Sequence, residues 1–187
     1  MLIVLKDKEN VYFARPVSGL GKFNVDNETN LLPNNTCLWK VVSLNHCVGG
    51  AENSSLVADL VKYNPDFFSE DINVKNLIQD VVPRIIMLAD RYRATNDGWL
   101  FDKMFFAQDD RAYVVEEPGT VSEIEEFEVD GLGSEILCTS LAKSRGQDPI
   151  ERIKKAFADF NATRNQPSSD ILVIDTKSTE LQIVKAN

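Results

Sequence analysis

The sequence predicts a layered α+β fold. Runs typical of β-strands come in three groups along the chain, and two groups with helical periodicity separate them. This grouping favours layered antiparallel sheets over a parallel sheet, in which strands and helices would alternate. The 187 residues show no internal repeat and no linker-like segment, so we expect one domain spanning residues 1–187.

The first group of strands opens the chain. Leu2–Leu5 and Val11–Ala14 are rich in β-formers and are separated by a charged turn, which predicts a hairpin. Residues 15–35 are rich in Gly, Asn and Pro and are typical of a loop. Cys37–Asn45 is predicted to be a further strand, which we expect to end at Gly49-Gly50.

Two helices are expected next. Asn53 or Ser54 can cap the first, in which apolar residues recur at helical spacing from Leu56 to Val61. Asp71 or Asn73 can open the second, and Pro83 should kink or divide it because proline lacks a backbone N–H. The apolar stripe of this second helix consists of Val74, Leu77, Ile78, Val81, Ile85, Leu88 and Tyr92.

The stretch from Lys103 to Ser134 predicts a three-strand meander that leads into a helix. Its apolar-rich runs are Met104–Ala107, Ala112–Val115 and Thr120–Val129, and short polar turns join them. A glycine-rich corner, Gly131-Leu132-Gly133-Ser134, follows. We interpret this corner as a close approach of two layers in preference to a phosphate-binding turn, because no complete phosphate-binding motif is present.

The last third of the chain predicts two helices and a hairpin. Ile136, Leu137 and Leu141 indicate a helix that ends near Gly146. Asp148-Pro149 is a start signal for the next helix, since an acidic N-cap precedes proline at the first helical position. The closing hairpin is expected from Ile171–Asp175 and Leu181–Lys185.

Composition excludes several classes of function. The net charge of −9 argues against nucleic-acid binding, which needs clustered cations. No apolar run approaches the roughly 20 residues that cross a bilayer, and the first residues lack the pattern of a signal peptide. We therefore expect a cytoplasmic protein with no membrane partner.

Candidate sites for metals and nucleophiles are weak. The cysteines Cys37, Cys47 and Cys138 form no CxxC pair, so we expect reduced thiols and no zinc site. His46 and Cys47 are neighbours on a predicted strand, where adjacent side chains point to opposite faces, so a catalytic pair is disfavoured. The acidic residues Glu126, Glu128 and Asp130 share one strand face, which we interpret as a solvated edge and not as a cation site. We expect no cofactor and no metal.

The order of these elements resembles that of proteasome-type subunits of the N-terminal-nucleophile (Ntn) hydrolase superfamily, and the resemblance covers nearly the whole chain. It implies a four-layer αββα sandwich of two antiparallel sheets flanked by helix pairs. The segments that carry it are Leu2–Ala14, Gly49–Asn53, Ala107–Tyr113 with Gly119 and Val121, Gly131–Gly133, and Asp148–Phe157.

The resemblance also implies a set of catalytic positions. The family uses a nucleophile, usually Thr, whose own α-amino group serves as base, together with a nearby lysine and orienting acidic and serine side chains. At the matching positions this chain departs from the pattern almost throughout, and only the serine is kept. The matching residues are Met1 and Leu2 for the nucleophile, Arg15 and Asn165 for acids, Thr36 for the lysine, Leu132 for one serine, and Ser168 for the other.

Two hypotheses follow. The first is a proteasome-like subunit, degenerate at its catalytic positions, that acts through self-assembly into a homo-oligomer or ring, or by binding a protein partner. The second is an active Ntn-type peptidase or amidohydrolase. Its nucleophile would be exposed by processing or supplied by a different site around Ser168, Ser134 or Thr36.

Overall fold

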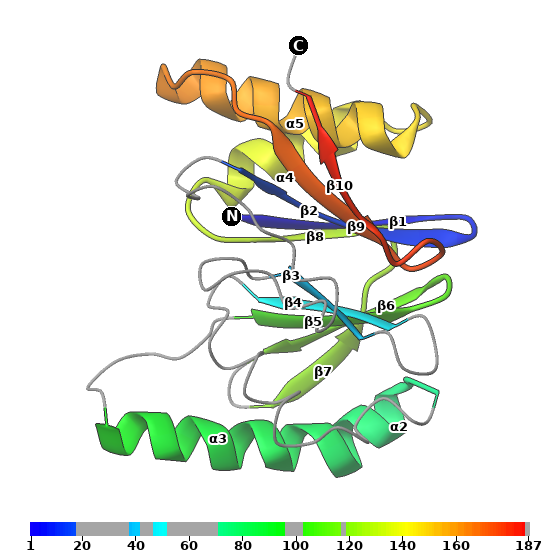
Figure 1. Cartoon of the computed structure of the whole chain (residues 1–187), viewed down its shortest axis with the longest axis vertical. Helices are drawn as coiled ribbons and strands as arrows, with labels where there is room; N and C mark the ends of the chain where they lie inside the picture. The colour runs from blue at the N-terminus through cyan, green and yellow to red at the C-terminus, as the bar shows by residue number, and fades with distance from the viewer. Residues whose placement is uncertain (18–37, 42–46, 52–70, 96–102, 117–118, 186–187) are drawn as a thin grey trace.

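The described elements form four layers (Figure 1). The computed structural model describes residues 1–17, 38–41, 47–51, 71–95, 103–116 and 119–185. Two helices cover one five-stranded antiparallel sheet, a second five-stranded antiparallel sheet lies beneath the first, and a further helical segment covers the far side. The architecture is the α+β, αββα arrangement expected from the sequence.

The upper sheet, which we call sheet A, contains both ends of the described chain. Its strand order is β10-β9-β2-β1-β8. β1 and β2 form the predicted opening hairpin, and β9 and β10 form the predicted closing hairpin. The bounds are β1 Leu2–Asp7, β2 Asn10–Pro16, β8 Phe127–Asp130, β9 Ile171–Asp175 and β10 Leu181–Val184.

The lower sheet, sheet B, has the order β3-β4-β5-β6-β7. Gly49 and Gly50, expected to end a strand, instead lie within β4, opposite Phe106 and Phe105 of β5. Because glycine carries no side chain, these positions leave room for the two buried rings. The bounds are β3 Leu38–Val41, β4 Cys47–Ala51, β5 Lys103–Gln108, β6 Arg111–Glu116 and β7 Thr120–Glu123.

The predicted strand Thr120–Val129 is wrong as a single element. It is divided into β7 and β8, which belong to different sheets. Between them Ile124 donates its N–H to Ala112 O of sheet B and buries its side chain between the sheets. Two residues later Glu126 O accepts from the N–H of Lys6 in sheet A. The chain therefore crosses between the sheets at residues 124–126.

The helical layer beneath sheet B is divided, as Pro83 predicted. It runs as α2 (Val74–Asn76), a π-helical segment η1 (Leu77–Val81) and α3 (Val82–Thr95). Pro83 has no N–H and therefore cannot donate an α-helical hydrogen bond. At the residue just before it, the N–H of Val82 bonds to Leu77 O, five residues earlier, which is the spacing of a π-helix. Asn73 is the N-cap and forms a reciprocal capping box with Asn76.

The predicted apolar stripe of this layer is only partly correct. Leu77, Val81, Ile85 and Leu88 are buried, whereas Val74 and Ile78 are exposed. The wider turn of the π-helical segment shifts the helical phase, so residues assigned to one face by a 3.6-residue period separate. Tyr92 and the helix predicted near Leu56 lie outside the residues whose side chains the structure describes.

The helices above sheet A match their start signals. α4 spans Ser134–Lys143 and α5 spans Pro149–Arg164. The Asp148 side chain accepts from the N–H groups of Ile150 and Glu151, and proline occupies the first turn. A Cβ at Gly133, whose φ is +87°, would lie 2.4 Å from the Phe160 ring. The glycine corner therefore permits the close approach of layers that the sequence predicted.

β1 contributes to two of the cores among the described residues. Alternation along β1 sends Leu2 and Val4 into the core between the sheets, and Ile3 and Leu5 into the core beneath α4 and α5. Of the helices that the structure describes, none is long and apolar enough to span a membrane.

Candidate functional site

Strand register brings Leu2 and Arg15, two of the family positions, to one end of the sandwich, which we call the β1 end. Ile3 pairs with Ala14 and Leu2 pairs with Asp130, so the start of β1 lies beside the ends of β2 and β8. Arg15 pairs with Leu172 near the start of β9. In an antiparallel sheet the start of one strand lies beside the end of its neighbour, so these strand termini lie at the same end of the sheet. The N-terminus marks this end in Figure 1.

Hydrocarbon-rich side chains, those of Met1 and Leu2, stand at the positions that the resemblance aligns with the family's nucleophile. Leu2 is 0% exposed and packs between the sheets. Met1 is partly buried and packs toward the helix layer above sheet A. Neither side chain carries an atom that can attack a carbonyl.

The other family positions are only partly gathered. Arg15 is half-buried on β2, close to Leu2 in register. Leu132, in the turn before α4, is 75% exposed. Asn165 caps the end of α5 with a left-handed φ of +52°, and Ser168 is exposed between α5 and β9. Thr36 lies outside the described residues, so its placement stays a prediction.

A charged cluster at the β1 end was missed by sequence reasoning. Lys103 Nζ, at the start of β5, lies 2.5 Å from Glu128 Oε1 of β8 and 3.8 Å from Glu116. The contact between Lys103 and Glu128 therefore joins sheet B to sheet A. Asp130, two residues beyond Glu128, is 6% exposed.

This cluster keeps Lys103 charged. Partial burial alone would lower the pKa of Lys103, but the hydrogen bond and charge of Glu128, aided by Glu116 and Asp130, outweigh burial and raise it. A lysine in this state offers a fixed positive charge and does not act as a base at neutral pH. The sequence signal was the alternation Lys103, Phe105, Ala107, which places the lysine on the inward face of its strand.

The acidic face predicted as a solvated edge has a different structure. Glu126 lies 2.6 Å from Arg145 and 2.8 Å from Arg152, and Glu128 pairs with Lys103. Burial acts to raise the pKa of Glu126, but its bonds to Arg145 and Arg152 outweigh burial and lower it. Across the described ranges, no group of three or more His, Cys, Asp or Glu side chains could hold a metal ion.

Two cysteines can be placed. Cys47 and Cys138 are free, and Cys47 is buried in β4. Burial raises the pKa of the Cys47 thiol well above its usual value, which suppresses the reactive thiolate. Cys47 therefore fits the interpretation of a reduced core thiol. His46 and Cys37 lie outside the described residues.

Comparison with solved structures identifies the fold. The chain is similar to Anbu (ancestral beta-subunit) from Yersinia bercovieri, with 11% identity, a TM-score of 0.58, and coverage of 100% of this chain and 87% of that one. HslV from Trypanosoma brucei gives 12% identity, a TM-score of 0.57, and coverage of 93% and 97%. Thiobacillus denitrificans BPH in complex with epoxomicin gives 14% identity, a TM-score of 0.55, and coverage of 93% and 96%.

These similarities establish a proteasome-type Ntn-hydrolase fold, as the sequence resemblance implied. No protein-family model and no curated protein sequence matches the chain. At identities of 11 to 14%, the comparisons establish the fold and leave the activity to be argued from the residues.

Proposed function

We propose that this protein is a non-catalytic subunit of the proteasome family, a single αββα unit that acts through self-assembly or by binding a protein partner. The observation that carries the proposal is the fully buried Leu2 at the start of β1. A side chain without oxygen or sulfur at that place cannot begin attack on a carbonyl. The free thiols of Cys47 and Cys138 are consistent with the reducing conditions of the cytoplasm, where we place the subunit.

The surroundings of Leu2 support the same conclusion. Arg15 stands on β2 where the resemblance implies an acid, and it would repel a protonated base instead of orienting it. Leu132 stands where the resemblance implies a serine, and its side chain projects into solvent. Lys103 supplies a cation at this end, but Glu128 already engages it.

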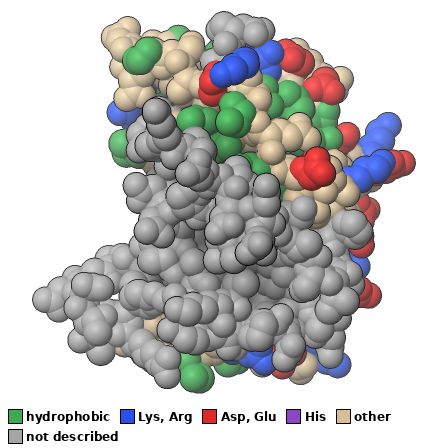
Figure 2. Space-filling model, viewed as in Figure 1, with side chains coloured by type: hydrophobic (Ala, Val, Ile, Leu, Met, Phe, Trp, Pro, Cys, Tyr) green, Lys and Arg blue, Asp and Glu red, His purple; other side chains and the backbone are tan. Residues whose placement is uncertain are grey.

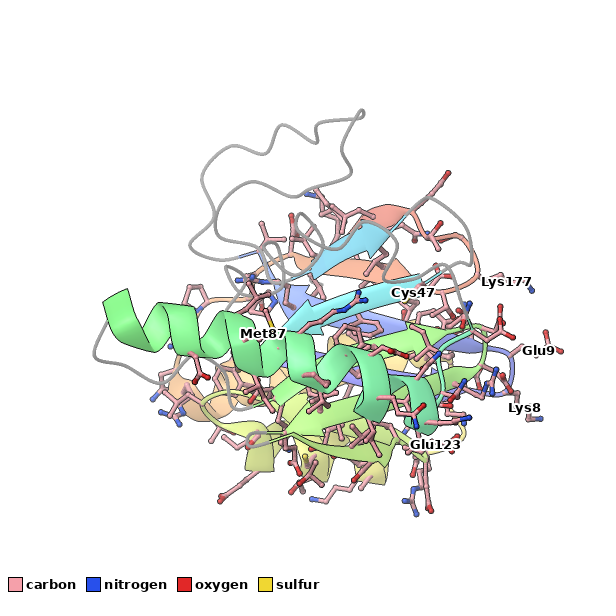
Figure 3. All side chains as sticks on the ribbon, turned by 90° about the horizontal axis from the view of Figure 1, so that it is seen from below. Lys8, Glu9, Cys47, Met87, Glu123 and Lys177 are labelled. Carbon is pink, nitrogen blue, oxygen red and sulfur yellow. The ribbon has the colours of Figure 1, made fainter. Side chains whose placement is uncertain are left out.

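Support for assembly comes from the helical layer beneath sheet B. Val74, Ile78, Ile86 and Met87 expose apolar side chains along this layer, and Met87 is 64% exposed. Figure 3 looks at the molecule from this side, with α3 in front and Met87 labelled on it. Several exposed apolar residues on one helical layer are a common feature of surfaces that associate with protein.

The alternative is an active Ntn-type peptidase or amidohydrolase with an unrecognised or processing-dependent nucleophile. The similarity to a structure in complex with epoxomicin favours testing it directly. The purified protein is incubated with epoxomicin, and its intact mass and N-terminal residue are measured by mass spectrometry, with BPH as the positive control. We expect BPH to gain mass and this protein to remain unmodified. An adduct, or a mature N-terminus of Thr, Ser or Cys, would overturn the non-catalytic proposal.

Self-assembly is tested by light scattering after size-exclusion chromatography at micromolar concentration. We expect a mass that is a multiple of 21.0 kDa. Met87→Ser should shift the population toward monomer, because it removes an apolar contact. The matched control, Ile183→Ser on β10, changes a side chain that is 52% exposed on a different layer and should leave the mass unchanged. A monomer at every concentration would contradict self-assembly, and equal effects of both variants would contradict the assigned surface.

A further inference from the structure

Strand β7 forms one edge of sheet B. It pairs with β6 on one side and, among the strands that the structure describes, with none on the other. The N–H of Ile124 bonds to Ala112 O, and hydrogen-bonded pairs alternate along an antiparallel ladder, so the even-numbered residues of β7 face β6. Val121 and Glu123 therefore direct their N–H and C=O groups toward the open edge. Such an edge is a template on which an extended segment can add as a further strand.

An apolar row of the helical layer lies beside this edge. Val74, Ile78, Val82 and Ile86 recur every four residues and share one side of the layer. α2 and η1 both contact β7, and a Cβ at Gly119, just before β7, would lie 2.6 Å from Val82 and 3.9 Å from Ile86. Val74, Ile78 and Ile86 are 39%, 49% and 44% exposed, so the row is only half covered. The lower border of Figure 2, where the helical layer lies in Figure 1, shows apolar side chains beside charged ones.

An added strand would place alternate side chains against this apolar row. Ala112 and Val114 of β6 point into the core between the sheets, so Val115 points to the opposite face, toward the helical layer. Val121 pairs with Val115 and shares its face. The residue of an added strand that lies opposite Val121 would point the same way. An apolar side chain at that position would cover part of the exposed surface of Ile78.

The charge around β7 favours a basic strand. Residues 116–130 contain seven Asp or Glu and no Lys or Arg. The Glu123 side chain is 49% exposed and lies 3.7 Å from Lys6 Nζ, which is too far for a hydrogen bond. Its carboxylate can therefore accept from a further cation. The β7 strand of a second copy would bring like charges together, whereas a basic segment would be attracted.

We propose that the open edge of β7 binds an extended segment of a partner protein, in which a basic residue and an apolar residue stand two positions apart. The segment adds antiparallel to β7, with its apolar side chain opposite Val121 and its basic side chain opposite Glu123. Main-chain hydrogen bonds to these two residues supply affinity, and the two side chains fix the register. This inference rests on the partner-binding branch of the proposed function and is independent of self-assembly.

The probe is the peptide acetyl-Thr-Lys-Thr-Ile-Thr-amide, titrated into the full chain while the amide signals of residues 120–123 are followed by NMR. Antiparallel addition places its Lys opposite Glu123 and its Ile opposite Val121. We expect saturable shifts with a dissociation constant on the order of 1 mM. The control peptide acetyl-Thr-Glu-Thr-Ile-Thr-amide keeps the apolar residue and should bind more weakly. No shift with the Lys peptide, or equal binding of both peptides, would overturn the proposal.

Methylation of single peptide nitrogens tests the strand geometry. In antiparallel addition the N–H groups of the peptide's Lys and Ile face β7, and that of the central Thr points away. N-methylation of the Ile should therefore weaken binding by about tenfold, because it removes a main-chain hydrogen bond. N-methylation of the central Thr should leave the affinity nearly unchanged. Equal effects of the two modifications, or the reverse order, would show that the peptide does not bind as a strand.

Two substitutions in the protein locate the site. Ile78→Ser should weaken peptide binding by about threefold, since it removes apolar surface that the peptide's Ile covers. Glu123→Gln should abolish the preference for the Lys peptide over the Glu peptide, and it provides the test if Ile78→Ser fails to fold. Ile183→Ser, in sheet A at a similar exposure of 52%, is the matched control and should change neither property. Unchanged affinity in Ile78→Ser, or an unchanged preference in Glu123→Gln, would contradict the assigned site.

Light scattering separates this site from self-assembly. If the mass in solution rises when Glu123→Gln removes a repelling charge, the edge pairs with a second copy and the proposal of a partner strand is wrong. If no peptide binds while the mass remains a multiple of 21.0 kDa, the strand site fails and the proposed self-assembly stands. Peptide binding by a protein that stays monomeric would support the strand site and contradict self-assembly.

Discussion

The two halves of the sandwich differ in how completely their outer helices are packed. Above sheet A, α5 buries five side chains, and α4 and α5 meet closely at Gly133 and Phe160. Below sheet B, the described helical layer contains a π-helical segment and exposes Ile78, Ile86 and Met87. A groove beside α5 in the upper half is lined largely by polar side chains, whereas the described helical layer of the lower half exposes apolar ones.

The two halves also differ in their buried polar groups. In the upper half the buried Arg152 donates from its Nη2 both to Glu126 and to Leu141 O. In the lower half, the exposed apolar side chains of the described helical layer would contribute roughly 25 cal/mol for each Å² that a partner buried. This described layer is therefore the surface on which the proposed association is tested.

Substitutions that create a cavity in each half should have the largest effect on the free energy of unfolding and therefore test the comparison most strongly. Phe157→Ala in the upper helix layer should lower the free energy of unfolding by about 3–5 kcal/mol, and Ile85→Ala in the lower layer by about 2–5 kcal/mol. Both side chains are only 2% exposed. Urea unfolding followed by fluorescence and circular dichroism gives the measurement. We expect one cooperative transition in both variants because the sheets share a core. Two separate transitions would mean that the halves fold independently.

Arg152 tests the polar interior of the upper half. Arg152→Met should cost about 2–3 kcal/mol, since it leaves Leu141 O without a strong donor and removes one of the cations that Glu126 contacts. The matched control is Arg145→Met, which removes the other cation at a side chain that is 68% exposed. We expect the control to cost less than about 1 kcal/mol. If chemical denaturation shows that both variants lose the same free energy of unfolding, burial does not distinguish the two arginines.

A pH dependence should arise from the turn between β9 and β10. The Asp175 carboxylate accepts from Asn10, from the N–H of Lys177, and from the N–H and hydroxyl of Ser178. Burial acts to raise the pKa of Asp175, but these hydrogen bonds outweigh burial and lower it. Its stabilisation is therefore full above the unfolded pKa of about 3.9 and is lost as the pH falls through the lower folded value.

The corresponding variant is Asp175→Asn, which should cost about 1–2 kcal/mol at pH 7. The cost should shrink as the pH falls below about 3.9, where the unfolded carboxylate takes up a proton first and the folded one follows at its lower pKa. Thermal unfolding of both proteins from pH 7 down to pH 3 provides the comparison. Ser178→Ala, which removes one of the hydrogen bonds, should show a smaller loss over the same range. A cost that stays constant with pH would contradict the assigned role of the carboxylate.

Much of the fold could be predicted from sequence, because the signals were local. The Asp148-Pro149 start signal fixed α5, and alternating runs fixed the opening and closing hairpins. The failures were places where tertiary context decides. Thr120–Val129 has continuous strand composition, yet burial of Ile124 between the sheets divides it into two strands. Gly49-Gly50 has the composition of a turn, yet neighbouring strands and two large rings hold it in a sheet.

The site was less predictable than the fold. Sequence reasoning selected Met1, Leu2, Arg15, Leu132, Asn165 and Ser168 by position along the chain, and register places the first three close together. It could not find the cluster of Lys103, Glu128 and Asp130, because these residues come from strands in different sheets. It also could not show that Ser168 lines a groove against α5. Both facts depend on how layers meet, which periodicity along one strand does not encode.

Removal of the Lys103–Glu128 ion pair, which joins the two sheets at the β1 end, should have the smallest effect on the free energy of unfolding. Lys103→Met breaks the ion pair with Glu128 while keeping the length of the side chain, and should cost about 1 kcal/mol, since both partners are partly solvated. The folded pKa of Lys103 is raised, so the stabilisation is complete below the unfolded pKa of about 10.4 and is lost only as the pH rises through the folded value. The difference between wild type and Lys103→Met in urea unfolding should therefore be the same at pH 6 and pH 8. Lys185→Met, which removes a lysine that is 79% exposed and pairs with Asp170 in the same half, is the control and should cost less. A larger cost for Lys185→Met, or a difference that changes between pH 6 and pH 8, would mean that Lys103 does not act as a permanent cation between the two sheets.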